Sequence, residues 1–268
     1  TELLQEAYES GASDLHLIAQ SPPIFRIDGR LKSFGTYRLT KLDTEKMARE
    51  LVPESDWDFL ITEGELDFNY ELDGISRFRI NAFYHRDAIS IAVRVIPEKV
   101  PTIRDLHLPT TLEKLMENPQ GLILVTGPTG SGKTTTLAAM IRYINERDAK
   151  HIITLEDPIE YVHEHDRSII NQREVGKDTK SFSKGLRAAL RQDPDIILVG
   201  EIRDLETIST AITAAETGHL VVATLHTNSA IQTIDRIIDV FEPYQQRQIR
   251  LQLSEVLLAV ISQRLLPL

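Results

Sequence analysis

The first hundred residues alternate polar and apolar positions with the two-residue period of β-strands, interrupted by short helical stretches. The alternation predicts strands at residues 14–18, 24–27, 30–33, 67–72, 76–85 and 88–96. An Asp28-Gly29 pair between the second and third of these strands is typical of a β-hairpin turn. Helical spacing predicts helices at residues 1–10, 43–52 and 55–62, the second with Asp43 or Thr44 as its N-cap. This part of the chain is therefore predicted to be a small α+β domain.

From about residue 102 the pattern changes to short apolar runs that alternate with amphipathic segments. The apolar runs predict buried strands at residues 121–126, 151–155, 196–199 and 220–225. The amphipathic segments predict helices at residues 134–147, 181–193, 205–217, 228–240 and 244–265. Strands that alternate with helices form a parallel sheet covered by helices, so the second part is predicted to be an α/β domain.

The boundary between the two parts is predicted at a proline-flanked stretch. Pro97 and Pro101 lie four residues apart, and proline interrupts both helices and strands. We therefore predict one domain over residues 1–97, a linker over 98–101 and a second domain over 102–268.

Composition narrows the class of protein. The 268-residue chain has a net charge of −10 and no cysteine, which argues against nucleic acid as the main partner and against disulfides or a thiolate zinc site. No apolar run approaches the roughly 18 residues of a membrane span. The first residues lack the basic and apolar regions of a signal peptide. We expect a cytoplasmic protein that reaches a membrane only through a partner.

One motif predicts the chemistry. Residues 127–134 (GPTGSGKT) match the phosphate-binding P-loop, between a predicted strand and a predicted helix, as that motif requires. The glycine-rich turn directs backbone N–H groups and the positive end of the helix dipole at one point, which suits the triphosphate of a nucleotide. Lys133 is expected to contact the β- and γ-phosphates and the Thr134 hydroxyl to bind Mg²⁺. The predicted nucleotide-binding residues are Gly127, Pro128, Thr129, Gly130, Ser131, Gly132, Lys133, Thr134 and Thr135.

Acidic residues follow the next strands of the predicted sheet, at the edge where a ligand binds. Glu156, Asp157 and Glu160 follow one strand, and Glu201 follows another. Gly200 stands where P-loop proteins often carry an aspartate for Mg²⁺, so we assign Glu201 to the metal, partly through water. Glu160 is then predicted to polarise the attacking water.

Two histidines flank the last predicted strand. Seven residues of extended chain separate His219 from His226 by roughly 23 Å, so both cannot contact one phosphate. We predict that His226 senses the γ-phosphate, and that His219 is structural or lies at a subunit contact.

Three arginines in the first domain allow two interpretations. Arg77 and Arg79 are two residues apart on one strand and share a face, and Arg94 lies on the next strand. They form either a solvated sheet face or a set of guanidinium groups offered to the phosphates of a neighbouring site. The absence of a nearby acidic run favours the second interpretation.

The chain resembles the type IV pilus retraction ATPases of the secretion ATPase superfamily over essentially its whole length. The motifs that carry this resemblance lie at residues 11–17, 22–29, 77–83, 127–134, 154–160, 193–204 and 217–227. The resemblance implies a PAS-like first domain, a RecA-like second domain, and a ring of six subunits with ATP between them. It also implies that Arg77 and Arg94, with Arg79 less certain, contact that ATP.

The resemblance also implies a cellular location and a partner protein. An inner-membrane platform protein of the pilus machine would be the partner, with the ATPase peripheral to the cytoplasmic face of that membrane. Members of the family normally continue beyond the equivalent of Leu268 with a helical region needed for retraction, so we expect a truncated or partly resolved chain.

Other functions remain open. Pilus extension and type II secretion ATPases are similar, although residues 234–241 and 263–267 look more like retraction members. A ring that binds ATP without hydrolysing it would lack a catalytic group, yet Lys133, Glu160 and Glu201 are all present. A nucleic-acid motor is disfavoured by the acidic charge.

Overall fold

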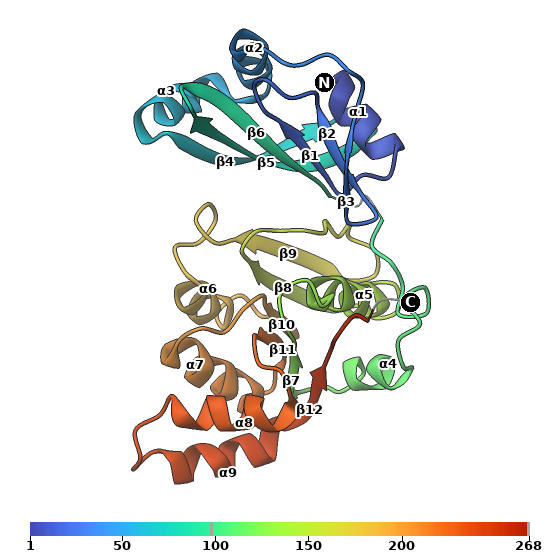
Figure 1. Cartoon of the computed structure of the whole chain (residues 1–268). Coiled ribbons are helices and arrows are strands. Elements are labelled where there is room, and N and C mark those ends of the chain that lie inside the picture. The colour runs from blue at the N-terminus through green and yellow to red at the C-terminus, as the bar shows by residue number, and fades with distance from the viewer. Residues whose placement is uncertain (97–98, 267–268) are drawn as a thin grey trace. The chain divides into compact units, whose positions relative to one another are not determined.

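The computed structural model describes residues 1–96 and 99–266, which divide into two compact units, Thr1–Glu98 and Lys99–Leu268. Figure 1 shows the course of the chain through both units. Part of the predicted linker, and Pro267 in the stretch that resembles retraction members, lie outside the described residues.

The first unit is a six-stranded antiparallel sheet with helices against one face (Figure 1). Its strands, in sheet order, are β3 (Arg30–Ser33), β2 (Ile24–Ile27), β1 (Asp14–Leu17), β6 (Ala88–Ile96), β5 (Ser76–His85) and β4 (Glu65–Leu72). The helices are α1 (Glu2–Glu9), α2 (Lys41–Leu51) and α3 (Glu54–Glu63). Phe78 and Ile80 of β5 are buried beneath these helices, while Arg79 between them faces the other side. The predicted α+β elements are confirmed.

Helix α2 begins two residues before its predicted start, and its predicted N-cap is wrong. Thr40 is the N-cap: its side chain accepts a hydrogen bond from the Asp43 backbone N–H, and Asp43 Oδ2 accepts one from the Thr40 backbone N–H at 2.7 Å. Asp43 is therefore the third helical residue of a capping box, which satisfies two backbone donors reciprocally.

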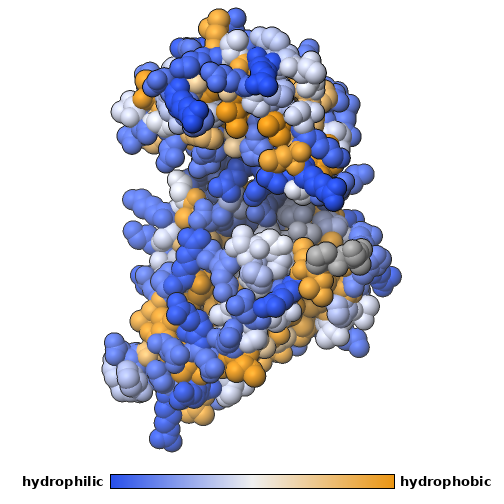
Figure 2. Space-filling view, viewed as in Figure 1, coloured by the Kyte–Doolittle hydropathy of each residue, from blue (hydrophilic) through white to orange (hydrophobic). Residues whose placement is uncertain are grey.

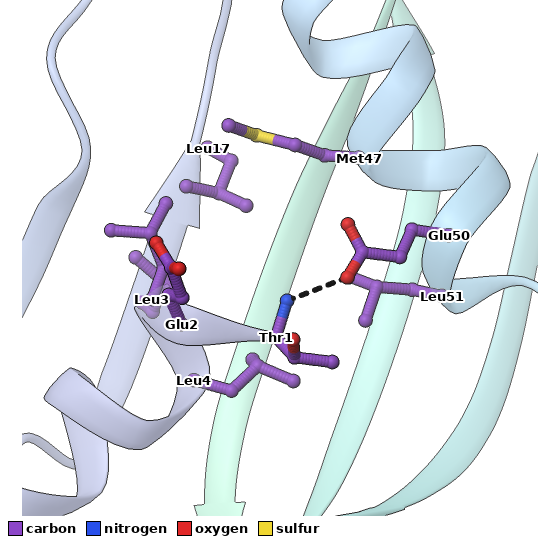
Figure 3. Close-up of a pocket in the computed structure, with 9 residues that line it drawn as sticks. Thr1, Glu2, Leu3, Leu4, Leu17, Met47, Glu50 and Leu51 are labelled. Atoms are coloured by element: carbon purple, nitrogen blue, oxygen red, sulfur yellow. Dashed lines mark hydrogen bonds and ion pairs between the residues drawn. The ribbon is translucent and has the colours of Figure 1, made fainter.

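A cavity of about 300 Å³ lies in the first unit between α1, β1 and α2 (Figure 3). Leu3, Leu17 and Met47 contribute apolar walls, and the Thr1 amino group donates a 2.9 Å hydrogen bond to Glu50 at its rim. None of the residues predicted to bind ATP lines this cavity.

The second unit is a six-stranded parallel sheet covered by helices on both faces (Figure 1). In sheet order its strands are β12 (Leu257–Ser262), β7 (Gly121–Thr126), β11 (Leu220–Leu225), β10 (Ile196–Val199), β8 (His151–Glu156) and β9 (Ile169–Glu174). One face packs against α6 (Phe182–Ala189), α7 (Leu205–Glu216), α8 (Ala230–Asp239) and α9 (Gln246–Val256). The other packs against α4 (Thr111–Met116) and α5 (Lys133–Asn145). The predicted α/β architecture is confirmed.

The predicted helix over residues 244–265 is confirmed only in its first half, as α9, and is wrong beyond Val256. Helix α9 ends at Val256, the Leu257 backbone turns extended, and residues 257–262 form β12. The segment is rich in Leu, Val and Ile, which can fill either a helix or a buried strand, and parallel pairing with β7 decides the outcome. Helix α4 and strand β9 were not predicted from the sequence.

No helix among residues 1–96 and 99–266 has the length and hydrophobicity needed to cross a membrane. Figure 2 shows hydrophobic residues interspersed with hydrophilic ones on the visible face of each unit.

Candidate nucleotide-binding and hydrolysis site

The P-loop joins the carboxyl end of β7 to the first turn of α5. Gly130 and Gly132 have φ angles of +76° and +85°, in the left-handed region that glycine adopts without strain. Gly132 is the N-cap of α5, and no side chain caps the helix. The free N–H groups of the first turn and the helix dipole therefore point at the loop, which is the arrangement that binds phosphate.

Lys133 lies at the centre of this loop and is only 8% exposed. Its Nζ donates hydrogen bonds of 2.9 and 3.0 Å to the carbonyl oxygens of Gly127 and Pro128. Burial lowers the pKa of Lys133, while the nearby carboxylates of Glu201 and Glu160 act in the opposite direction. The structure therefore brings the predicted phosphate-binding lysine within electrostatic reach of both predicted catalytic glutamates.

Gln263, which the sequence analysis noted only for its family likeness, lies against the P-loop. Its backbone N–H donates to the Thr126 carbonyl at 2.8 Å, and its side-chain oxygen accepts a 2.9 Å hydrogen bond from the Thr136 hydroxyl. A Cβ atom on Gly132 would lie 2.9 Å from Gln263 Nε2, and one on Gly127 would lie 2.3 Å from the Gln263 carbonyl oxygen. Gly127 thus needs to be glycine because the Gln263 backbone approaches it closely, whereas Gly132 needs glycine chiefly for its positive φ, since the Gln263 side chain near it can move.

Steric hindrance also explains why residue 200 is a glycine. Its backbone N–H donates to the Leu155 carbonyl at 2.7 Å, and an added Cβ would lie 2.9 Å from that same oxygen. The close approach of β10 to β8 leaves no room for a side chain at residue 200. The next residue, Glu201, is consequently the first acidic group after β10.

Glu201 is held by two partners at the carboxyl edge of the sheet. Its Oε2 accepts a hydrogen bond from Arg203, and its Oε1 lies 3.3 Å from His226 Nε2. The hydrogen bond from Arg203, followed by the charges of Arg203 and His226, lowers the pKa of Glu201. The structure thus makes Arg203, two residues further along the chain, a direct partner of the candidate metal ligand.

Glu160 lies on the loop that follows β8, and neighbouring side chains hold this loop in place. The Ile159 backbone N–H donates to Glu174 Oε2 at 3.2 Å, and the Tyr161 hydroxyl lies 3.2 Å from the Thr135 hydroxyl of α5. Glu156 ends β8 and is buried, and this burial raises the pKa of its carboxyl group. The partly buried Glu160 is thus better placed than Glu156 to meet a solvent-derived nucleophile.

The two histidines lie at opposite ends of β11. His226 follows the carboxyl end and pairs with Glu201. His219 precedes the amino end, where its Nδ1 lies 3.0 Å from the Ala214 carbonyl oxygen. The latter contact indicates a structural role for His219.

The three arginines share one face of the first unit's sheet, opposite its helices. Arg79 of β5 lies directly across from Arg94 of β6. Arg94 Nε lies 3.1 Å from Asp14, and Arg77 Nε lies 3.8 Å from Glu71. No acidic run was expected near these arginines, but neighbouring strands supply single acidic partners to two of them.

Comparison with known proteins gives one family. The Type II/IV secretion system protein family matches residues 1–268. The chain is 49% identical to the type IV pilus retraction ATPase PilT of Pseudomonas aeruginosa over 99% of this chain and 77% of that protein. It is 47% identical to a twitching motility protein of Neisseria gonorrhoeae over 93% of this chain and 67% of that one.

A solved structure agrees with these relatives. The crystal structure of the pilus retraction motor PilT with bound ADP matches with a TM-score of 0.94 and 55% identity, over 99% of this chain and 78% of that one. The P-loop, the acidic sheet edge and these likenesses lead to one conclusion: the chain belongs to the Type II/IV secretion system protein family and is an ATPase of that family.

Proposed function

We propose that the chain hydrolyses Mg-ATP at the carboxyl edge of the second unit's sheet and that this hydrolysis drives retraction of type IV pili. The main support for ATP hydrolysis is that Glu160 and Glu201 lie close enough to Lys133 of the P-loop to interact with it electrostatically. Phosphoryl transfer needs mainly positioning and charge neutralisation, and this set supplies both. The retraction part is supported by relatives named for retraction and twitching.

The residues of the site divide the chemistry among them. The backbone N–H groups of residues 129–135 and the Lys133 ammonium bind the phosphates, with Thr134 and Thr135 on the first turn of α5. Among the described residues no cluster of three acidic, histidine or cysteine groups could hold a metal alone. If Mg²⁺ binds together with ATP, the Thr134 hydroxyl would be one of its ligands and Glu201 would hold a water of its hydration shell. When bound, the ion would neutralise charge on the phosphates.

Glu160 and His226 complete the proposed machinery. Glu160 orients the attacking water and accepts its proton, while His226, paired with Glu201, responds to the γ-phosphate. The observation that supports this division is that Glu201 is already engaged by Arg203 and His226.

The assembly is part of the proposal. We propose a ring of six subunits in which Arg77 and Arg94 of one subunit contact ATP bound by its neighbour. The support is a row of partly exposed and exposed arginines on one face of a sheet in a unit separate from the P-loop unit. The proposed partner is an inner-membrane platform protein of the pilus machine, met at the cytoplasmic face of that membrane.

Deletion of the gene tests the direction of work. Pili that persist but fail to retract would support the proposal, whereas cells that fail to form pili would favour an extension ATPase. Complementation with wild type and with Lys133→Ala tests whether the phenotype depends on nucleotide turnover. An ATPase rate that rises severalfold on addition of DNA would instead indicate a nucleic-acid motor.

A further inference from the structure

The side-chain amide of Gln172, on strand β9, makes three hydrogen bonds around the loop that carries Glu160. Its Nε2 donates to Glu156 Oε1 at 2.9 Å and to the Tyr161 carbonyl at 2.8 Å. Its Oε1 accepts a hydrogen bond from the His163 backbone N–H at 2.8 Å. One side chain thus contacts Glu156, which precedes the loop, and Tyr161 and His163, which follow Glu160.

Because the surroundings of the Gln172 amide are buried, a residue that lacks its donors and acceptor cannot replace it. Glu156 and Tyr161 are buried, at 9% and 8% exposed, so few water molecules can replace a lost partner there. An amide has two donor hydrogens and an acceptor oxygen, and Gln172 uses all three. A hydrocarbon offers none of these groups, and a carboxylate offers only acceptors. The pairing therefore requires glutamine rather than a residue of similar size.

Gln172 lies beside the site without facing the P-loop contacts described above. Strand β9 is the edge strand next to β8, and Gln172 pairs in register with Thr154. The Thr154 hydroxyl donates to the same Glu156 oxygen that Gln172 contacts. Glu174, two residues after Gln172 on β9, accepts a hydrogen bond from the Ile159 backbone N–H. Alternate side chains of β9 therefore hold the loop 157–162 from one side.

We propose that Gln172 is a positioning residue for Glu160: its amide ties both ends of the loop to β9 and so fixes the distance between the Glu160 carboxylate and the attacking water. The proposal rests on the proposed role of Glu160 as the base. A general base must lie within hydrogen-bond reach of the proton it removes, and a displacement of about 1 Å can cost about 100-fold in rate. Nucleotide binding, which depends on the P-loop, should not need Gln172.

The first test replaces the amide with an unbranched chain of similar length. Gln172→Met should lower kcat by about 10- to 100-fold and leave the KM and Kd for Mg-ATP within about twofold of wild type. Asn171→Leu is the matched control: Asn171 is the preceding residue of β9, is exposed, and makes its 2.8 Å hydrogen bond to His151 at the other end of β8. This control should keep the wild-type kcat.

The second test uses pH as a readout that a general loss of structure would not change. Gln172→Glu keeps an acceptor for the His163 N–H but, when ionised, puts a second negative charge beside Glu156 and donates nothing. Burial beside the Glu156 carboxyl group should raise the pKa of this new carboxyl, so protonation should restore one donor and the ratio of variant to wild-type kcat should rise as the pH is lowered from 8 to 5. A ratio that stays constant over this range would overturn the proposal.

A double variant separates this inference from the proposed function. If Gln172 acts through Glu160, then adding Gln172→Met to Glu160→Gln should not lower the residual rate further. A wild-type kcat in Gln172→Met, or a loss seen only as a raised KM, would refute the positioning role while leaving the role of Glu160 intact. If Glu160→Gln itself hydrolyses ATP at the wild-type rate, the assignment of the base fails instead.

Discussion

His226 Nε2 lies 3.3 Å from Glu201 Oε1, and this contact joins the carboxyl ends of the neighbouring strands β11 and β10. Because Arg203 binds the other oxygen of the same carboxylate, both Glu201 oxygens have cationic or polar partners. The hydrogen bond from Arg203 and the neighbouring charges lower the pKa of Glu201. A carboxylate held in its ionised form is a good partner for a hydrated metal and a weak acceptor for a proton.

This contact separates the expected effects of changing the two glutamates. Glu160→Gln keeps the size of the side chain and removes the base, so the variant should bind Mg-ATP with wild-type affinity and lose hydrolysis by about 100-fold or more. Glu201→Gln should instead weaken the dependence of ATP binding on Mg²⁺, because the group assigned to the metal's water shell loses its charge.

The measurements are ATP affinity with and without Mg²⁺ and single-turnover hydrolysis, for both variants. Glu206→Gln, an exposed residue that pairs with Arg187 on α6, is the control and should behave as wild type. If Glu201→Gln traps Mg-ATP tightly while Glu160→Gln loses its metal dependence, then the two roles are the reverse of those proposed.

Removal of the Lys133 ammonium should abolish ATP turnover. This group is the side-chain cation at the P-loop, so in Lys133→Ala the β- and γ-phosphates lose their main side-chain partner. Lys114→Ala, which changes an exposed lysine of α4, serves as the control and should retain the wild-type rate. Near-normal turnover in Lys133→Ala would remove the loop from its assigned role.

Arg77 and Arg94 are expected to act across a subunit boundary. Loss of an arginine that contacts the transferred phosphate can lower the rate by about three to five orders of magnitude. Arg94→Ala chains and Lys133→Ala chains, each inactive alone, should therefore regain partial activity when mixed, because some interfaces then hold an intact arginine and an intact P-loop. Mixed rings verified by mass that stay inactive would refute the assignment.

Gly200→Ala should destabilise the second unit and reduce hydrolysis together. The added Cβ would lie 2.9 Å from the Leu155 carbonyl oxygen and 3.3 Å from the Glu156 Cα, so β10 and β8 must separate. Overpacking of this kind typically costs about 1–3 kcal/mol. Thermal unfolding and kcat measure the two effects, and an unchanged melting temperature would show that the strands can move apart freely.

His163 should make the protein sensitive to mild acid. Burial lowers the pKa of His163 from 6.5 to about 4, so between these values the unfolded chain binds a proton that the folded chain does not. Stability should therefore fall as the pH drops from about 6.5 towards 4, by ~2 kcal/mol at pH 5 relative to neutral pH.

Urea unfolding of wild type and of His163→Gln at pH 7 and pH 5 checks this expectation. The variant lacks the titrating group, so its loss of stability between the two values should be smaller than that of wild type. Equal losses in the two proteins would show that other groups cause the acid sensitivity.

Local patterns along the chain were sufficient for much of the fold and for the core of the site. The P-loop is recognisable because its phosphate-binding geometry is made by consecutive residues between one strand and one helix. The buried strands β7 and β11 are continuous apolar runs because neighbours cover both of their faces. The Asp28-Gly29 hairpin is equally local, since its turn residues determine the pairing of β2 and β3.

Only the tertiary structure decided the features that depend on contacts between distant residues. Residues 257–262 are a strand because β7 offers them a partner, although their apolar composition suits a helix as well. Asp14, the acidic partner of Arg94, lies 80 residues away along the sequence. Thr136 donates a hydrogen bond to Gln263, which is 127 residues away. Gln172 could not be identified for the same reason: β9 was not predicted, and the amide reaches the Glu160 loop only when β8 and β9 pair.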